Sequence, residues 1–167
     1  MDRYTYRPPK RTGPAAALAG GCFMLSAALL VSLRMSGSLT GLVVTACASL
    51  LLCGVAVTSR FILSSFIYVL DKGVLSVFRI QGSKSVRISA VSLSEVEEIF
   101  DRKALRHYEK KQGKIRTRRN YCCNLYVREP YALVLSEDGT STAVFLEADE
   151  LFIDQIKIIW KNGLSSY

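Results

Sequence analysis

The chain has 167 residues and a formal net charge of +8, and 50% of its residues are hydrophobic. The 108 residues after Ser59 suffice for one domain, whose own core needs far fewer apolar residues than the whole chain supplies. Five cysteines give no disulfide framework, because three fall inside apolar runs and Cys122 and Cys123 are adjacent. Reduced thiols are therefore expected, which excludes a small disulfide-stapled secreted domain.

Two uncharged apolar runs lie near the start, at Ala15–Leu33 and Leu39–Ser59. They hold 19 and 21 residues, and a helix of roughly 20 apolar residues spans a bilayer core. Only Arg34–Ser38 separates them, so the second helix must return across the membrane. The predicted organisation is a basic tail (1–14), a transmembrane hairpin (15–33 and 39–59), one domain (60–162) and a short tail (163–167).

Basic residues are distributed unevenly around this hairpin. The loop between the runs carries only Arg34, whereas Arg60 directly follows the second run. Because Lys and Arg flanking short segments stay in the cytoplasm, we expect a multi-pass cell-membrane protein with both termini cytoplasmic. The basic residues before the first run are Arg3, Arg7, Lys10 and Arg11, against the single acid Asp2.

The first run also fits a cleaved signal peptide, since it has a basic tail and an apolar centre. Leu18–Cys22 resembles a lipoprotein cleavage box, but its cysteine comes one residue late and most of the apolar run follows it. A second span also follows at once. We therefore favour a retained hairpin.

Small residues repeat along both runs at four-residue spacing. Helices in lipid associate where small residues allow close approach, so we expect these faces to meet within the hairpin. The stripe could instead mediate dimerisation, or reflect how common small residues are in such helices. Neither run has an ionisable side chain other than cysteine, which argues against transport. The residues are Gly41, Thr45, Ser49 and Cys53 in the second run, and Ala17 with Gly21, or Ala16 with Gly20, in the first.

After Arg60 the pattern changes from helical to strand-like. The stretch Leu93–Phe100 fits a helical turn or a strand, and we favour the strand. Arg102–Arg119 is polar and is predicted to be a loop. The predicted strands are Phe61–Leu70, Val74–Gln81, Val86–Ala90, Leu93–Phe100, Tyr121–Val127, Tyr131–Ser136 and Thr142–Leu146, with turns at Asp71–Gly73, Gly82–Ser83 and Glu137–Thr140.

The chain ends in a helical period. Asp149 and Glu150 at the start and Lys157 and Lys161 near the end suit the helix dipole, and Gly163 is a natural stop. The predicted domain is therefore α+β or all-β, with about seven short antiparallel strands followed by one amphipathic helix. The apolar side of that helix consists of Leu151, Phe152, Ile156, Ile159 and Trp160.

Three segments carry a resemblance: Ser59–Asp71, which enters directly from the second span, the hairpin Asp71–Ser76, and Tyr131–Phe152, which leads into the closing helix. Through them the chain resembles the bacterial pleckstrin-homology-like (PH-like) membrane proteins, over roughly Arg60–Asn162. Trp160 is similar to the tryptophan typical of such domains. The resemblance implies a transmembrane helix pair before a small PH-like barrel, with no catalytic residues.

The densest charge lies in Arg102–Arg119, which holds nine basic residues and one acid. It could be a solvated loop, or it could bind acidic phospholipid headgroups, where each Lys or Arg is worth about 1 kcal/mol. A protein partner is a further reading, and nucleic acid is less favoured because no recognisable module accompanies the run. The candidate anion-binding residues are Arg102, Lys103, Arg106, Lys110, Lys111, Lys114, Arg116, Arg118 and Arg119.

Catalysis finds little support. The only histidine, His107, lies in the basic segment without a serine or cysteine at a telling spacing. Cys122–Cys123 with one histidine is a weak metal-ligand set, and no cofactor is expected. The sequence thus predicts a non-enzymatic, membrane-anchored interaction module at the cytoplasmic face of a bacterial membrane, which binds acidic lipid, a protein partner or a second copy. The alternative is a structural subunit of a larger membrane complex.

Overall fold

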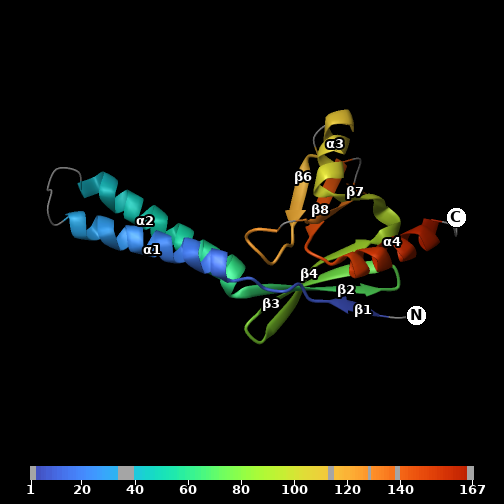
Figure 1. Cartoon of the computed structure of the whole chain (residues 1–167), viewed down its shortest axis with the longest axis horizontal. Coiled ribbons are helices and arrows are strands. Elements are labelled where there is room, and N and C mark those ends of the chain that lie inside the picture. Colours follow the sequence, from blue (N-terminus) through green and yellow to red (C-terminus); the bar gives the residue numbers. More distant parts are fainter. Residues whose placement is uncertain (1–2, 34–39, 113–114, 128, 138–139, 165–167) are drawn as a thin grey trace. The chain divides into compact units, whose positions relative to one another are not determined.

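The structure is a computed structural model that describes residues 3–33, 40–112, 115–127, 129–137 and 140–164. The chain divides into two units (Figure 1). One contains the helix pair, from Lys10 to Ser64, together with Asn124–Tyr126. The other contains the residues up to Pro9, Ser65–Cys123 and Val127 onward.

The first unit is a helical hairpin. Helix α1 spans Gly13–Leu33, with Pro14 in its first turn, and helix α2 spans Thr40–Val57 and continues as the π-helical segment η1, Thr58–Ile62. The helices pack closely at Gly54, where a Cβ atom would lie 3.0 Å from the Phe23 ring. The predicted loop Arg34–Ser38 lies outside the described residues.

The structure places a different set of small residues between the two helices. The faces that meet carry Ala19, Ser26 and Cys47, which are at most 3% exposed, and the Ser26 hydroxyl donates to the Cys47 carbonyl at 3.3 Å. The Thr45 and Ser49 hydroxyls donate to carbonyls of their own helix, so they need no partner helix. The residues of the predicted stripe are exposed, except that Gly20 is partly buried: Gly41, Thr45, Ser49, Cys53, Ala16, Ala17 and Gly21.

The second unit contains two four-stranded sheets. The first has the order β1-β2-β3-β4 and the second the order β5-β7-β8-β6. The strands are β1 (Tyr4–Tyr6), β2 (Ser64–Asp71), β3 (Val74–Gln81), β4 (Lys84–Ser92), β5 (Val96–Asp101), β6 (Thr117–Asn120), β7 (Tyr131–Glu137) and β8 (Thr140–Leu146).

These sheets correct the expected closed barrel of seven antiparallel strands. The described residues form eight strands in two open sheets, and β6 runs parallel to β8. The two extra strands are three and four residues long and lie in segments that the sequence suggested were a tail and a loop. Each depends on pairing with a distant strand, which a local pattern does not reveal.

The first sheet follows the predicted turns. Lys72 and Gly73 both have positive φ, 49° and 74°, which is the backbone of a two-residue type I′ hairpin. Strand β2 begins three residues later than predicted, because Phe61 and Ile62 still belong to η1. Leu93–Phe100 contains both alternatives, since a short 3₁₀ turn, η2 (Leu93–Glu95), precedes β5.

Three further predictions need correction. Arg102–Arg119 is not a loop: it contains helix α3 (Arg102–Gln112) and strand β6. Tyr121–Val127 is irregular rather than a strand; the Tyr121 carbonyl accepts a bond from the buried Tyr68 hydroxyl at 2.9 Å. Helix α4 (Glu150–Leu164) continues through Gly163.

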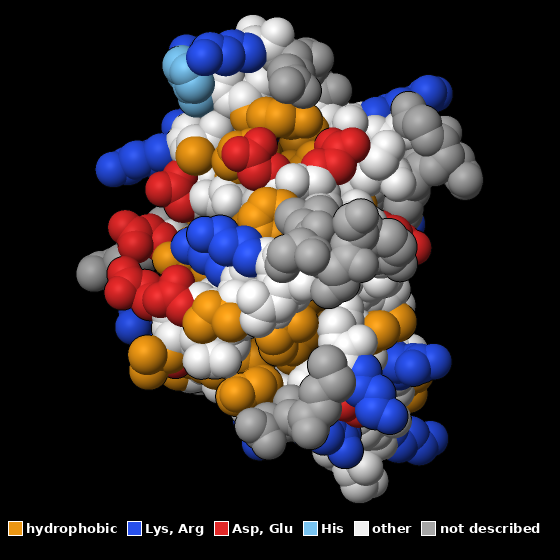
Figure 2. Space-filling model, turned by 90° about the vertical axis from the view of Figure 1, so that its right-hand side faces the viewer, with side chains coloured by type: hydrophobic (Ala, Val, Ile, Leu, Met, Phe, Trp, Pro, Cys, Tyr) orange, Lys and Arg blue, Asp and Glu red, His pale blue; other side chains and the backbone are white. Residues whose placement is uncertain are grey.

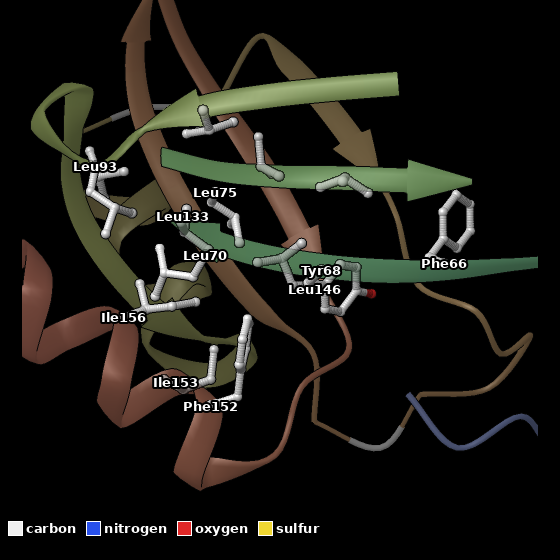
Figure 3. Close-up of a cluster of buried hydrophobic side chains, with 14 of the residues drawn as sticks. Phe66, Tyr68, Leu70, Leu75, Leu93, Leu133, Leu146, Phe152, Ile153 and Ile156 are labelled. Atoms are coloured by element: carbon white, nitrogen blue, oxygen red, sulfur yellow. The ribbon is translucent and has the colours of Figure 1, made fainter. Parts of the chain in front are cut away.

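The main core lies between the inner faces of the two sheets and α4. Phe152, Ile153 and Ile156 of α4 point at Tyr68 and Leu70 (Figure 3). The Trp160 indole donates to the Val96 carbonyl at 2.8 Å and ties the end of α4 to β5. This arrangement leaves the outer face of the second sheet for α3.

Candidate functional site

Helix α3 begins at a side-chain cap. The Asp101 carboxylate accepts a hydrogen bond from the Ala104 amide at 2.6 Å, which satisfies one free donor of the first turn. Leu105 is 4% exposed and packs against the outer face of the second sheet, and the Tyr108 ring lies 4.8 Å from the Phe100 ring. Burial, and then the charges of Glu97 and Glu98, raise the pKa of Tyr108. The helix is thus fixed on the sheet by one face.

The cationic side chains lie on the other face of α3. Residues four apart share one side of a helix, so Arg102, Arg106 and Lys110 form one row, with Lys103 and Lys111 in the adjacent rows opposite Leu105. All five are exposed, and none has a hydrogen-bond or ion-pair partner among the residues that the structure describes. Figure 2 shows Lys and Arg side chains over α3 at the top, with Asp and Glu side chains below them. We call these five residues the α3 basic face.

The other predicted anion-binding residues do not join this face equally. Arg118 on β6 pairs with Glu109 of α3 at 2.5 Å, which uses its charge within the protein. Arg119 is half-buried and has a partner, whereas Arg116 is exposed. Lys114 lies outside the described residues. The structure therefore gathers five of the nine predicted residues on one helix face.

A pocket of about 480 Å³ opens beside the start of α3. Burial, followed by the charge of Glu150, raises the pKa of Tyr131 in its wall. Three cations and three carboxylates share the lining, so the pocket is balanced in charge and does not select for an anion. Its lining residues are Asp101, Arg102, Lys103, Arg106, Glu129, Tyr131 and Glu150.

The two adjacent cysteines, Cys122 and Cys123, are held by hydrogen bonds within the fold. The Cys123 sulfur accepts a bond from the Phe66 amide at 3.2 Å, at the start of β2, where the paired residues of β1 do not reach. The Cys123 amide donates to Glu147 and the Cys122 amide to Asn120. His107 is exposed on α3. Across the described ranges, no three His, Cys, Asp or Glu side chains are grouped to hold a metal ion.

Both helices of the hairpin are long and apolar enough to cross a membrane, over Gly13–Ser32 and Gly41–Ile62. Strand β1 precedes α1 and pairs with β2, in the register Tyr6↔Tyr68 and Tyr4↔Leu70. The helix pair is thus an insertion between two neighbouring antiparallel strands of one sheet. Sequence reasoning missed β1, because three residues in a basic tail carry no strand signal of their own.

Comparison with known proteins yields no match: no protein-family model fits this chain, and neither curated proteins nor solved structures resemble it significantly.

Proposed function

We propose that this protein is a two-span membrane protein whose sheet-rich domain acts as a non-enzymatic interaction module at the cytoplasmic face of a bacterial membrane. The observation that carries the proposal is the insertion of the helix pair between β1 and β2. Because these strands are neighbours, both ends of the pair must leave the membrane on the same side. The basic residues Lys10, Arg11 and Arg60 at these ends favour the cytoplasm.

The exposure of the helices supports a membrane environment. A core helix of a soluble protein is mostly buried, whereas only 22% and 11% of the two apolar windows are buried. Leu52 and Met24, at 72% and 75% exposure, are examples of large apolar side chains that need lipid or protein around them. A cleaved signal peptide fits less well, because cleavage would separate β1 from the sheet that it completes.

The α3 basic face is the surface that we assign to binding. Five cations on one helix face, which have no partner in the described part of the chain, attract an anionic surface, and each is worth about 1 kcal/mol close to acidic lipid. Acidic phospholipid is the proposed ligand. The likeness to PH-like domains is retained only for the order of elements, strands followed by a closing helix with Trp160.

Hydrogen exchange of the full chain in nanodiscs tests the lipid role. We expect the α3 amides to exchange more slowly in phosphatidylglycerol discs than in phosphatidylcholine discs. The triple variant Arg106→Gln, Lys110→Gln, Lys111→Gln should lose this difference. A control with the same charge loss elsewhere, Lys84→Gln, Arg87→Gln, Lys157→Gln, should keep it. Equal exchange of wild-type α3 in both lipids would exclude the lipid role.

The alternative, a subunit of a larger membrane complex, gains support from the exposed stripe Gly41, Thr45, Ser49 and Cys53. Small residues on a lipid-facing side allow another helix to approach. Crosslinking from Thr45→Cys in native membranes tests this, with Leu52→Cys as a control at an exposed large residue. Adducts to another chain from Thr45→Cys alone favour the subunit, whereas the absence of such adducts argues against it.

A further inference from the structure

A short loop from the sequence of the sheet-rich domain forms one compact unit with the helix pair. Asn124–Tyr126 lie between β6 and β7 in the chain, yet they group with Lys10–Ser64. The Arg11 amide donates to the Asn124 side-chain oxygen at 2.6 Å, and Asn124 is only 5% exposed. This partly buried bond fixes the loop to the segment that enters α1.

The same end of the helix pair is closed by a second bond. The Lys10 ammonium donates to the Ile62 carbonyl at 2.5 Å, which joins the entry to α1 with the last residue of η1. Helix α1 has 21 residues and is therefore about 31 Å long, close to the thickness of a bilayer core. A bilayer core matched to the helices thus ends near Gly13 and Arg60, which leaves Lys10, Arg11 and the attached loop in the headgroup layer.

The side chains at this level have the chemistry of that layer. Tyr126 is 75% exposed and Leu63 is 56% exposed. The Arg60 guanidinium lies 5.9 Å from the centre of the Phe61 ring. Tyrosine with an apolar ring and a polar hydroxyl, beside Lys and Arg, is typical of the boundary between lipid and water.

We propose that the loop Asn124–Tyr126 is a third membrane contact, in which Tyr126 lies in the phospholipid headgroup layer and Asn124 holds it there through Arg11. This rests on the proposed function, since it needs the helix pair in a bilayer. The loop adds to the two spans a contact from the middle of the domain sequence. The ligand is the headgroup layer of the same membrane, beside the cations Lys10, Arg11 and Arg60.

Depth-dependent fluorescence quenching tests the contact in the full chain. Trp160→Phe removes the single tryptophan, and Tyr126→Trp then places the only indole in the loop. In bilayers of lipids brominated near the headgroup or near the chain ends, we expect stronger quenching by the shallow bromines. Leu52→Trp, which lies deep in the span of α2, serves as the control and should be quenched more strongly by the bromines near the chain ends.

The outcomes separate the two proposals. Quenching of Leu52→Trp without quenching of Tyr126→Trp refutes the loop contact and leaves the membrane hairpin intact. Absence of quenching at both positions overturns both proposals. Adding Asn124→Ala to Tyr126→Trp should weaken loop docking about two- to ten-fold through the lost hydrogen bond, seen as reduced shallow quenching. Unchanged quenching would refute the role of Asn124.

Discussion

Helices α4 and α3 cover opposite faces of the second sheet, but they contribute unequally to the fold. Helix α4 inserts Phe152, Ile153 and Ile156 into a cluster of 16 buried residues, whereas α3 adds only Leu105 to a cluster of six. Because α3 needs so little of its surface for packing, the rest is free to carry charge. Helix α4 therefore contributes mainly to the stability of the fold, whereas α3 contributes mainly a charged surface.

Truncation of one buried side chain in each helix gives the largest expected contrast. Ile153→Ala should lower the free energy of unfolding by about 2–5 kcal/mol, because Ile153 is fully buried in the main core. Leu105→Ala should cost less, about 1–3 kcal/mol, since the outer cluster is small. Urea unfolding in detergent, followed by Trp160 fluorescence, measures both.

Hydrogen exchange shows which elements lose protection in each variant. In Leu105→Ala, α3 should exchange faster while the strands of the first sheet keep their protection. Equal losses of stability, with exchange raised throughout the domain in both variants, would contradict the division between the two helices.

Two tyrosines, Tyr68 in the main core and Tyr108 beneath α3, allow the same comparison between the two sides of the second sheet. The Tyr68 hydroxyl donates to the Tyr121 carbonyl at 2.9 Å and accepts from the Glu147 amide at 3.2 Å. Tyr68→Phe should therefore cost about 1–3 kcal/mol, because two backbone groups lose their partner. Tyr108→Phe, beneath α3, should change stability by less than about 0.5 kcal/mol, since Tyr108 packs by its ring. Urea midpoints compare the two variants.

The pH dependence gives an independent check of Tyr68. Burial is the main cause that raises its pKa above the ordinary 10.0. Above pH 10 the unfolded chain loses this proton while the folded chain keeps it, so stability falls by up to about 1.4 kcal/mol per pH unit. Below pH 10 this contribution is complete. Tyr68→Phe should flatten the alkaline fall in stability, and an unchanged slope would argue against the burial of this hydroxyl.

Strands whose own residues show a strand pattern could be predicted from the sequence. Strands that depend on pairing with a distant segment could not. Strand β3 was predicted at its observed bounds, and the turn at Lys72–Gly73 and the amphipathic α4 were found from turn chemistry and period. Strand β1 was not predicted, because its three residues are ordered by pairing with β2. The first residue of β2, Ser64, comes 58 residues after Tyr6.

The sequence contained one indication of helix α3, and it lies in strand β7. Ala132, Leu133, Val134 and Leu135 are all completely buried, so β7 is covered on both faces and lacks alternation. That poor alternation was a signal that another element covers the outer face. Helix α3 was missed because its apolar stripe is only Leu105 and Tyr108. The cations were proposed from composition, but their arrangement on one helix face was not predicted.

The caps of the two helices give the smallest and most closely matched contrast. The Asp149 carboxylate accepts from the Phe152 amide at 2.9 Å, just as Asp101 accepts from Ala104. Each Asp→Ala change should cost its helix about 1 kcal/mol. Because α4 is part of the main core, Asp149→Ala should lower the urea midpoint of the whole domain. Asp101→Ala should act mainly on α3, whose first-turn amides should exchange faster, with a smaller shift of the midpoint. If Asp101→Ala lowered the midpoint as much as Asp149→Ala, α3 would unfold together with the core, and its charged face could not be separated from the stability of the fold.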